Sequence, residues 1–296
     1  MKYLLGIIAA LSLIFGTLLF SSYNTSQDTT KASLPVVSST IFPLTDIIKN
    51  VGKDVVEVKQ ILPDGANPHS YDPRPDDIRT VAESHAFYII GHHLDAWATN
   101  LGTSNNTPVI TIDKNIKLRA GADEHEDEYE IDPHYWLSIP NAQLIAGNIA
   151  VDLQHRFPNQ SDRISQNLAA YNEQLVAADK EIRSMLGNLT NKNLVTFHDG
   201  LQYFAAEYGL TIIGTALPTN NTEPSPKYLG ELRDTITKAG VKTLYTEPQF
   251  SIDPIAQFTK DEHLKTAELF TDVGSGDITS YILLMRHNAA TISQNQ

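Results

Sequence analysis

Three histidines and one aspartate lie in turn-like segments beside apolar stretches. His69 follows VVEVKQIL, His134 lies in DPHYWLS, His198 ends NLVTFH and Asp272 follows ELFT. The four residues are widely and evenly spread, so they cannot form a local finger and can meet only where two similar lobes face each other. Three imidazoles and a carboxylate suit a divalent transition metal, zinc foremost. The spacing therefore predicts a metal site in a cleft between two lobes.

The amino-acid composition limits which partners the protein can bind and which residue types can form its functional site. The chain has 296 residues, with 22 Lys and Arg against 35 Asp and Glu, for a formal net charge of −13. This balance argues against a nucleic-acid partner and favours cations. There is no cysteine, which excludes disulfides, thiolate metal sites and cysteine nucleophiles. A chain of this length more often makes two domains than one.

The N-terminus predicts export. Lys2 precedes the uncharged run LLGIIAALSLIFGTLLF, which is typical of a signal sequence. No A-x-A site ends this run, and its length of about 17 residues is at the short end for a membrane span. A cleaved signal and an uncleaved N-terminal anchor are alternatives, and we favour the anchor. Residues 1–33 would then be the signal or anchor segment with a polar tether from residue 21, and the protein would be periplasmic or at the cell surface.

From Leu34 the sequence alternates between short apolar strands and amphipathic helices. VVSSTIF, VVEVKQIL, AFYIIG and TPVITID have the β-branched and aromatic content of strands, and helical patterns separate them. This alternation predicts an α/β lobe with a mainly parallel sheet over residues 34–157. The candidate ligands follow strands, where open α/β sheets bind their ligands.

A long helix is predicted over residues 158–187, with Ser161 as its N-cap and Gly187 at its end. It would run roughly 35–40 Å, enough to traverse both lobes. Strand–helix alternation then restarts and predicts a second lobe over residues 188–296. The predicted fold is therefore two βα lobes joined by one rigid helix. The apolar stripe of the helix is predicted to consist of Ile164, Leu168, Tyr171, Leu175, Ala178, Ile182 and Met185.

These segments together resemble the substrate-binding proteins of bacterial zinc/manganese ABC importers. The likeness runs from Leu34 to the end and rests on STIFPLTDIIKNVG, GANPHSYDPRPDDI, DPHYWLS, the FHDGLQYF turn and a Y…M…N pattern near the C-terminus. The resemblance implies two βα lobes joined by a rigid helix. It also implies that His69 and His134 are ligands from the N-terminal lobe, and His198 and Asp272 from the C-terminal lobe.

Two segments depart from the family pattern. The histidine-rich loop of zinc-type relatives is replaced by GADEHEDEYEID, in which His125 is the one histidine. We interpret residues 123–130 as a solvated excursion, the alternative being a weak zinc scavenger. TDVGSGD stands where the family usually has D-P-x-G, so Asp277 and Glu247 are substitutes for Asp272 as the fourth ligand.

The surroundings of the ligands also carry predictions. Asp132 or Trp136 is expected to fix the ring of His134. His92 and His93 are adjacent, so they point in different directions; we expect one to be exposed, the other packed, and neither to bind metal. At the position of His198 manganese-type relatives tend to have glutamate, and a third imidazole shifts the preference toward zinc.

The predicted function is an extracytoplasmic binding protein and not an enzyme. It would capture Zn²⁺ as transported substrate, with Mn²⁺ or iron(II) as alternatives. It would act as a monomer and deliver the metal to an ABC permease and its ATPase subunit. Four protein ligands close a zinc tetrahedron. The other functions considered are a zinc hydrolase, against which stands the lack of an H-E-x-x-H motif, and a surface adhesin, for which no feature specifies a host ligand.

Overall fold

A computed structural model describes residues 33–121, 131–217, 223–274 and 276–296. The predicted signal or anchor segment and the acidic excursion at 123–130 therefore lie outside the described residues, Ser33 excepted. Within the described ranges, no helix combines the length and apolar character that a membrane span requires.

The N-terminal sheet has four parallel strands in the order β2-β1-β3-β4. Its strands are β1 (Val36–Ser39), β2 (Glu57–Gln60), β3 (Phe87–Ile89) and β4 (Val109–Thr111). Between them run α2 (Phe42–Gly52), α3 (Pro75–Ala82) and α4 (Ala96–Ser104). Strand β3 is buried along its whole length, as expected for a parallel sheet covered on both faces.

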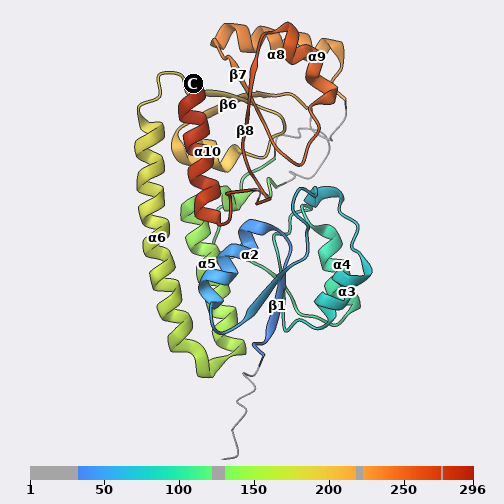
Figure 1. Cartoon of the computed structure of the whole chain (residues 1–296), viewed down its shortest axis with the longest axis vertical. Coiled ribbons are helices and arrows are strands. Elements are labelled where there is room, and N and C mark those ends of the chain that lie inside the picture. The colour runs from blue at the N-terminus through green and yellow to red at the C-terminus, as the bar shows by residue number, and fades with distance from the viewer. Residues whose placement is uncertain (1–32, 122–130, 218–222, 275) are drawn as a thin grey trace, which may run out of the picture. The chain divides into compact units, whose positions relative to one another are not determined.

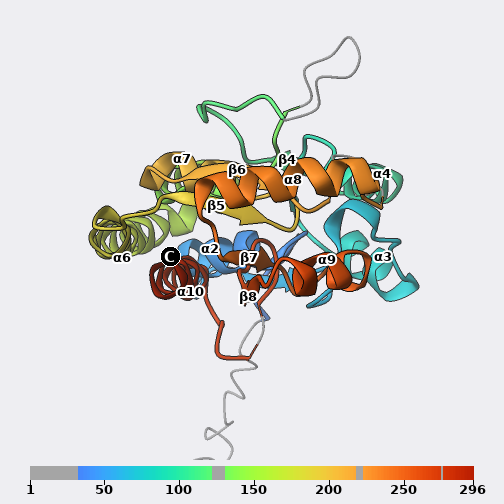
Figure 2. The same cartoon turned by 90° about the horizontal axis from the view of Figure 1, so that it is seen from above.

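The C-terminal sheet repeats this topology, with four parallel strands in the order β6-β5-β7-β8. Its strands are β5 (Asn193–Thr196), β6 (Thr211–Thr215), β7 (Thr243–Thr246) and β8 (Lys265–Glu268). Its helices are α7 (Gln202–Tyr208), α8 (Pro226–Ala239) and α9 (Ala256–Asp261). Figure 2 shows α7 and α8 on the β6 side of this sheet and α9 on the β8 side. The predicted α/β class with parallel sheets is confirmed.

Two long helices link the sheets. Helix α5 (Ile139–Arg156) leads through a 3-10 turn (Pro158–Gln160) into α6 (Ser161–Gly187). The 27 residues of α6 span about 40 Å, and Figure 1 shows the helix running alongside both sheets. The predicted long helix is confirmed, including its end at Gly187. Its buried residues are Ile164, Tyr171, Leu175, Ala178, Ile182 and Leu186.

Several details of these elements differ from the prediction. Gln160 and not Ser161 is the N-cap of α6, because the 3-10 turn leads straight into the helix. Met185 is 37% exposed, and Leu186 takes the last buried position of the stripe. Helix α7 begins at Gln202, four residues after His198, and β8 ends four residues before Asp272. Both Asp199 and Asp272 therefore lie in loops.

The last helix, α10 (Tyr281–Asn295), returns to the linking helices. It packs against α6 and also contacts α2 and β8. The largest apolar core contains buried residues of α2, α5, α6 and α10 together, within a compact unit of residues 34–296. One core thus extends past the predicted lobe boundaries at 157 and 187, and the division into separate lobes stays a prediction.

Candidate metal centre

Three of the four predicted ligands come together. His69 lies in a 3-10 turn after β2, His134 precedes a 3-10 turn, and His198 lies two residues after β5. One ligand nitrogen from each lies within 4.8 Å of the others. The ring centroids are 5.2 Å apart for His134 and His198 and 5.7 Å apart for His69 and His134. The two sheets thus contribute imidazoles to one small volume.

The backbone around His69 is fixed although its side chain is exposed. The Asn67 side chain accepts a hydrogen bond from the backbone N–H of His69 over 2.9 Å, which caps the turn. The indole Nε1 of Trp97 donates to the carbonyl of Pro68 over 2.9 Å. These two contacts orient the turn, so His69 can face the other imidazoles while remaining accessible to solvent.

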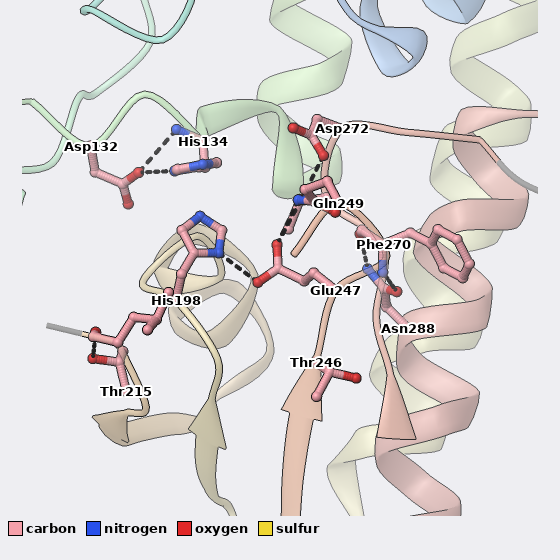
Figure 3. A network of polar contacts seen from close by, with 12 residues as sticks. Asp132, His134, His198, Thr215, Thr246, Glu247, Gln249, Phe270, Asp272 and Asn288 are labelled. Atoms are coloured by element: carbon pink, nitrogen blue, oxygen red, sulfur yellow. Dashed lines mark hydrogen bonds and ion pairs between the residues drawn. The ribbon is translucent and has the colours of Figure 1, made fainter. Parts of the chain in front are cut away.

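A carboxylate orients the ring of His134, as predicted. Asp132 Oδ1 lies 2.9 Å from the backbone nitrogen of His134 and 2.8 Å from its ring Nδ1. Both side chains are buried, and Figure 3 shows the double contact. Trp136, the other predicted partner, packs beside the ring and donates its indole N–H elsewhere, to the carbonyl of Thr271. With Nδ1–H donated to Asp132, the Nε2 lone pair of His134 is free to bind metal.

His198 has the same arrangement in the C-terminal sheet. Its Nδ1 lies 2.5 Å from Oε1 of the buried Glu247, at the end of β7 (Figure 3). Its Nε2 is buried and has no hydrogen-bond partner among the described residues. A Cβ added to Gly200 would lie 2.4 Å from Cε1 of His198 and 3.3 Å from Nε2 of His134. Glycine at this position therefore lets the chain pass close to both imidazoles.

Asp272 lies beside this group but is not part of it. Among the residues that the structure describes, the group that meets within 4.8 Å contains the three histidines alone. Asp272 is 3% exposed, and its Oδ1 lies 2.9 Å from Thr271 Oγ1, which is also 2.8 Å from Glu247 Oε2. The hydroxyl proton of Thr271 thus lies between two carboxylates. Of the two substitutes, Glu247 contacts Nδ1 of His198, while Asp277 is exposed.

Burial and these close charges shift the pKa values of the site. Burial and the nearby Glu247 carboxylate raise the pKa of Asp272 to about 6. Burial lowers the pKa of His198, but the Glu247 carboxylate outweighs this effect, so the net shift is upward. The ring of His69 reaches solvent, yet the protein atoms packed around it remove part of its hydration, and this effect together with the two other imidazoles lowers its pKa to about 3. In the metal-free protein, Asp272 and His198 therefore take up protons before His69 does as the pH falls.

The adjacent histidines of the GHHL turn lie outside the site. His92 is partly buried, and its Nε2 is 2.8 Å from Oδ2 of Asp113. His93 is exposed. The prediction of one packed and one exposed ring is confirmed. His125 falls outside the described residues.

Tyr203 on α7 is a site neighbour that the sequence analysis did not single out. Its hydroxyl accepts a hydrogen bond from the backbone N–H of Arg119 over 2.8 Å and donates to the carbonyl of Asp132 over 3.3 Å. Ala120 and Ile131 form an antiparallel bridge between these contacts. The two ends of the acidic excursion are therefore held together at α7. The FHDGLQYF turn was the available signal, because it places this tyrosine five residues after His198.

The chain is similar in sequence to known metal-binding proteins. Among curated sequences, the manganese ABC transporter substrate-binding lipoprotein PsaA of Streptococcus pneumoniae is 29% identical over 315 residues, covering 99% of each chain. The zinc-binding protein AdcA of Streptococcus pyogenes serotype M1 is 27% identical over 282 residues, covering 86% of this chain and 55% of AdcA.

Solved structures share the fold. The crystal structure of ZnuA superposes with a TM-score of 0.80 at 24% identity, covering 89% of this chain and 99% of ZnuA. The manganese-bound periplasmic metal binding protein of Candidatus Liberibacter asiaticus gives 0.78 at 23% identity, covering 88% and 98%. The family model described as zinc-uptake complex component A, periplasmic, matches residues 37–295. The chain therefore belongs to the family of the periplasmic component A of zinc-uptake complexes.

Proposed function

We propose that this protein captures zinc outside the cytoplasm and delivers it to the permease and ATPase subunit of an ABC importer. The family is one of solute-binding proteins and not of enzymes. Its relatives PsaA and AdcA are named as a manganese ABC transporter substrate-binding lipoprotein and a zinc-binding protein. In this role the metal is the transported substrate and not a resident cofactor.

The observation that carries the proposal is the convergence of three imidazoles from three separate segments of the chain, with two rings already oriented by carboxylates. His134 and His198 each have Nδ1 engaged, by Asp132 and Glu247. Their Nε2 atoms are thus the ones left to bind metal, as in carboxylate–histidine–zinc triads. We assign His69, His134 and His198 as ligands.

Asp272 is proposed as the fourth ligand. It is a buried carboxylate whose charge acts on both His134 and His198. A fourth protein ligand would close the zinc tetrahedron and leave no position for a reactive water. The zinc-hydrolase alternative also needs a general base. Asp132 and Glu247, the carboxylates in contact with the histidine rings, are both engaged by imidazole N–H groups.

The choice of zinc follows from the donor set. Three nitrogen donors and one oxygen suit zinc better than manganese, which favours oxygen ligands. Manganese is the second candidate metal, because PsaA is named for manganese and a structural relative is described with manganese bound. Iron(II) is the third candidate metal. The transport role is the same for each metal, and a competition experiment separates them.

We propose that this chain is attached to the membrane in a different way from PsaA, a relative named as a lipoprotein. The sequence has no cysteine to carry a lipid. We assign the apolar segment within residues 1–20 as an uncleaved anchor and residues 21–33 as its tether. Cell fractionation with mass spectrometry tests this: the anchored chain keeps its N-terminus in the membrane fraction, whereas a cleaved chain starts after the apolar run and is soluble. Light scattering of residues 34–296 should give a monomer.

The decisive functional test is metal competition. Metal-free protein is equilibrated anaerobically with equal Zn²⁺, Mn²⁺ and Fe²⁺, and bound metal is counted by mass spectrometry. We expect one zinc per chain in the wild type and in His93→Ala, the matched control with an exposed imidazole outside the site. We expect His134→Ala to lose it. Equal loading of His134→Ala and His93→Ala would show that the site is elsewhere.

A further inference from the structure

One face of α10 carries Tyr281, Met285 and Asn288, and its two polar members contact the ligand-bearing loops. Tyr281, Met285 and Asn288 follow one another at intervals of four and three, so they share a helix face. All three are fully buried. They form the Y…M…N pattern of the sequence. None of the three is a proposed metal ligand, and within the described residues none of them hydrogen-bonds to a ligand side chain. Two of them are polar, and buried polar side chains need partners.

Asn288 holds the backbone just before Asp272. Its Oδ1 accepts from the backbone N–H of Phe270 over 2.9 Å, and its Nδ2 donates to the carbonyl of Phe270 over 2.7 Å. Figure 3 shows both contacts. One side chain therefore satisfies both polar groups of a buried residue. An apolar replacement would leave the N–H and the carbonyl of Phe270 unpaired.

The same segment is also tied to the N-terminal part of the chain. The carbonyl of Thr271 accepts from Nε1 of Trp136 over 2.8 Å, and the carbonyl of Asp272 accepts from the N–H of Phe42 over 3.3 Å. Trp136 in turn offers its own carbonyl to the hydroxyl of Tyr281 over 2.6 Å. The hydrogen bonds therefore link α10 to the Asp272 loop, the Asp272 loop to the His134 loop, and the His134 loop back to α10.

We propose that α10 sets the position of Asp272 relative to His134, with Asn288 and Tyr281 as positioning residues of the metal site. The proposal rests on the proposed function. Strand β8 ends at Glu268, so the sheet does not fix Asp272, and TDVGSGD lacks a proline after the aspartate that would restrict the loop. Ligands must be held to about 0.5 Å for a defined coordination geometry. Contacts from α10 supply that restraint.

The test compares Asn288→Ala with Ile292→Ala. Ile292 lies one turn further along α10 and is equally buried, but it contributes only to the apolar core, so its truncation controls for lost stability. Each purified chain is titrated with Zn²⁺ against a chelator, and its Co²⁺ complex is recorded by visible absorption. We expect Asn288→Ala to bind zinc about 10- to 100-fold more weakly, the range seen for outer partners of ligands, with an altered Co²⁺ spectrum. Ile292→Ala should keep the wild-type spectrum and affinity.

Equal affinity and spectra in Asn288→Ala and wild type would overturn the proposal, as would equal losses in Asn288→Ala and Ile292→Ala. The proposed function fails on a different result, which is retention of zinc by His134→Ala.

A milder pair of variants covers the case in which Asn288→Ala does not fold. Tyr281→Phe removes the hydroxyl bound to Trp136, and Tyr208→Phe removes a hydroxyl bound to Asp179 on α6. We expect Tyr281→Phe to bind zinc up to about tenfold more weakly than the wild type. Tyr208→Phe should bind zinc as tightly as the wild type. Equal zinc affinity in the two variants would contradict the proposal.

Discussion

The carboxylate of Glu247 accepts a hydrogen bond from Nδ1 of His198 over 2.5 Å. Asp132 makes the equivalent contact with His134 over 2.8 Å on the other side of the site. The loop before α5 and the C-terminal sheet thus each bring a carboxylate–imidazole pair, in which the carboxylate selects the tautomer with a free Nε2. A buried acid therefore leaves Nε2 of each ring as the metal-binding nitrogen before metal arrives.

Removing either acid should weaken zinc binding without removing a ligand. We expect Glu247→Gln and Asp132→Asn each to lower zinc affinity by about 10- to 100-fold, because the imidazole loses its orienting charge. The measurement is competition with a chromophoric chelator. Glu268→Gln is the matched control for Glu247, since Glu268 is exposed at the end of β8. Wild-type affinity in Glu247→Gln would mean that this pair does not orient the ligand.

Metal selectivity should depend on His198 and Glu247 together. The sequence alone suggests that His198→Glu moves the preference toward manganese, because an oxygen donor replaces nitrogen. In the structure the new carboxylate would face Glu247, and two like charges at that distance repel. We therefore expect His198→Glu to weaken both metals and His198→Glu with Glu247→Gln to raise the manganese-to-zinc affinity ratio. An unchanged ratio in the double variant would show that geometry, and not donor type, sets the preference.

Acid should release the metal through Asp272 and His198. The pKa of Asp272 is raised to about 6, and that of His198 is raised by Glu247 after the opposing effect of burial. A proton on either group must leave before metal binds, so zinc affinity is lost as pH falls through these pKa values. We expect zinc to dissociate below about pH 6. Asp272→Asn should bind zinc more weakly at pH 7.5 but lose less affinity between pH 7 and pH 5. Full occupancy of the wild type near pH ~4 would contradict a three-histidine site.

The acidic excursion should affect the rate of capture more than the affinity. Its ends are already paired through Ala120 and Ile131 and held by Tyr203. Replacing residues 121–130 by Asn-Gly, a two-residue hairpin connection, should leave His134 in place. Six acidic residues are lost, so zinc association should slow at low ionic strength and recover toward the wild-type rate at 0.1 M salt, where the Debye length is about 10 Å. A large fall in equilibrium affinity would instead make His125 part of the site.

The α/β class, the long helix and the positions of the histidines could be predicted because each depends on local pattern. Strand–helix alternation predicts parallel sheets, and His69 and His198, which come after β2 and β5, lie where such sheets bind ligands. His134 precedes a 3-10 turn and does not directly follow a strand, so the alternation alone does not place it. Asp132 was predictable as the partner of His134 because it is two residues away. The role of Glu247 was only partly foreseen, since it depends on which strand lies next to β5, and β7 does so.

The rest could not be predicted because it depends on contacts between distant parts of the chain. Asn288 clamps a residue 18 positions earlier, and Tyr281 reaches Trp136 across 145 positions. No periodicity in the sequence encodes either pairing. The choice between Met185 and Leu186 at the end of α6 was missed for the same reason: the packing of neighbouring elements, and not the repeat of the helix itself, decides which residue is buried.

The most direct test of the account is X-ray absorption at the zinc edge on protein loaded with one zinc per chain. The account predicts a four-coordinate zinc with three imidazole nitrogens and one carboxylate oxygen at about 2.0–2.1 Å. The outer scattering should be characteristic of histidine rings. Any zinc that His134→Ala still binds at the high protein concentration of this measurement should show one ring fewer in that signal. Zinc surrounded by oxygen alone, or by the same number of rings in wild type and His134→Ala, would contradict the three-histidine site.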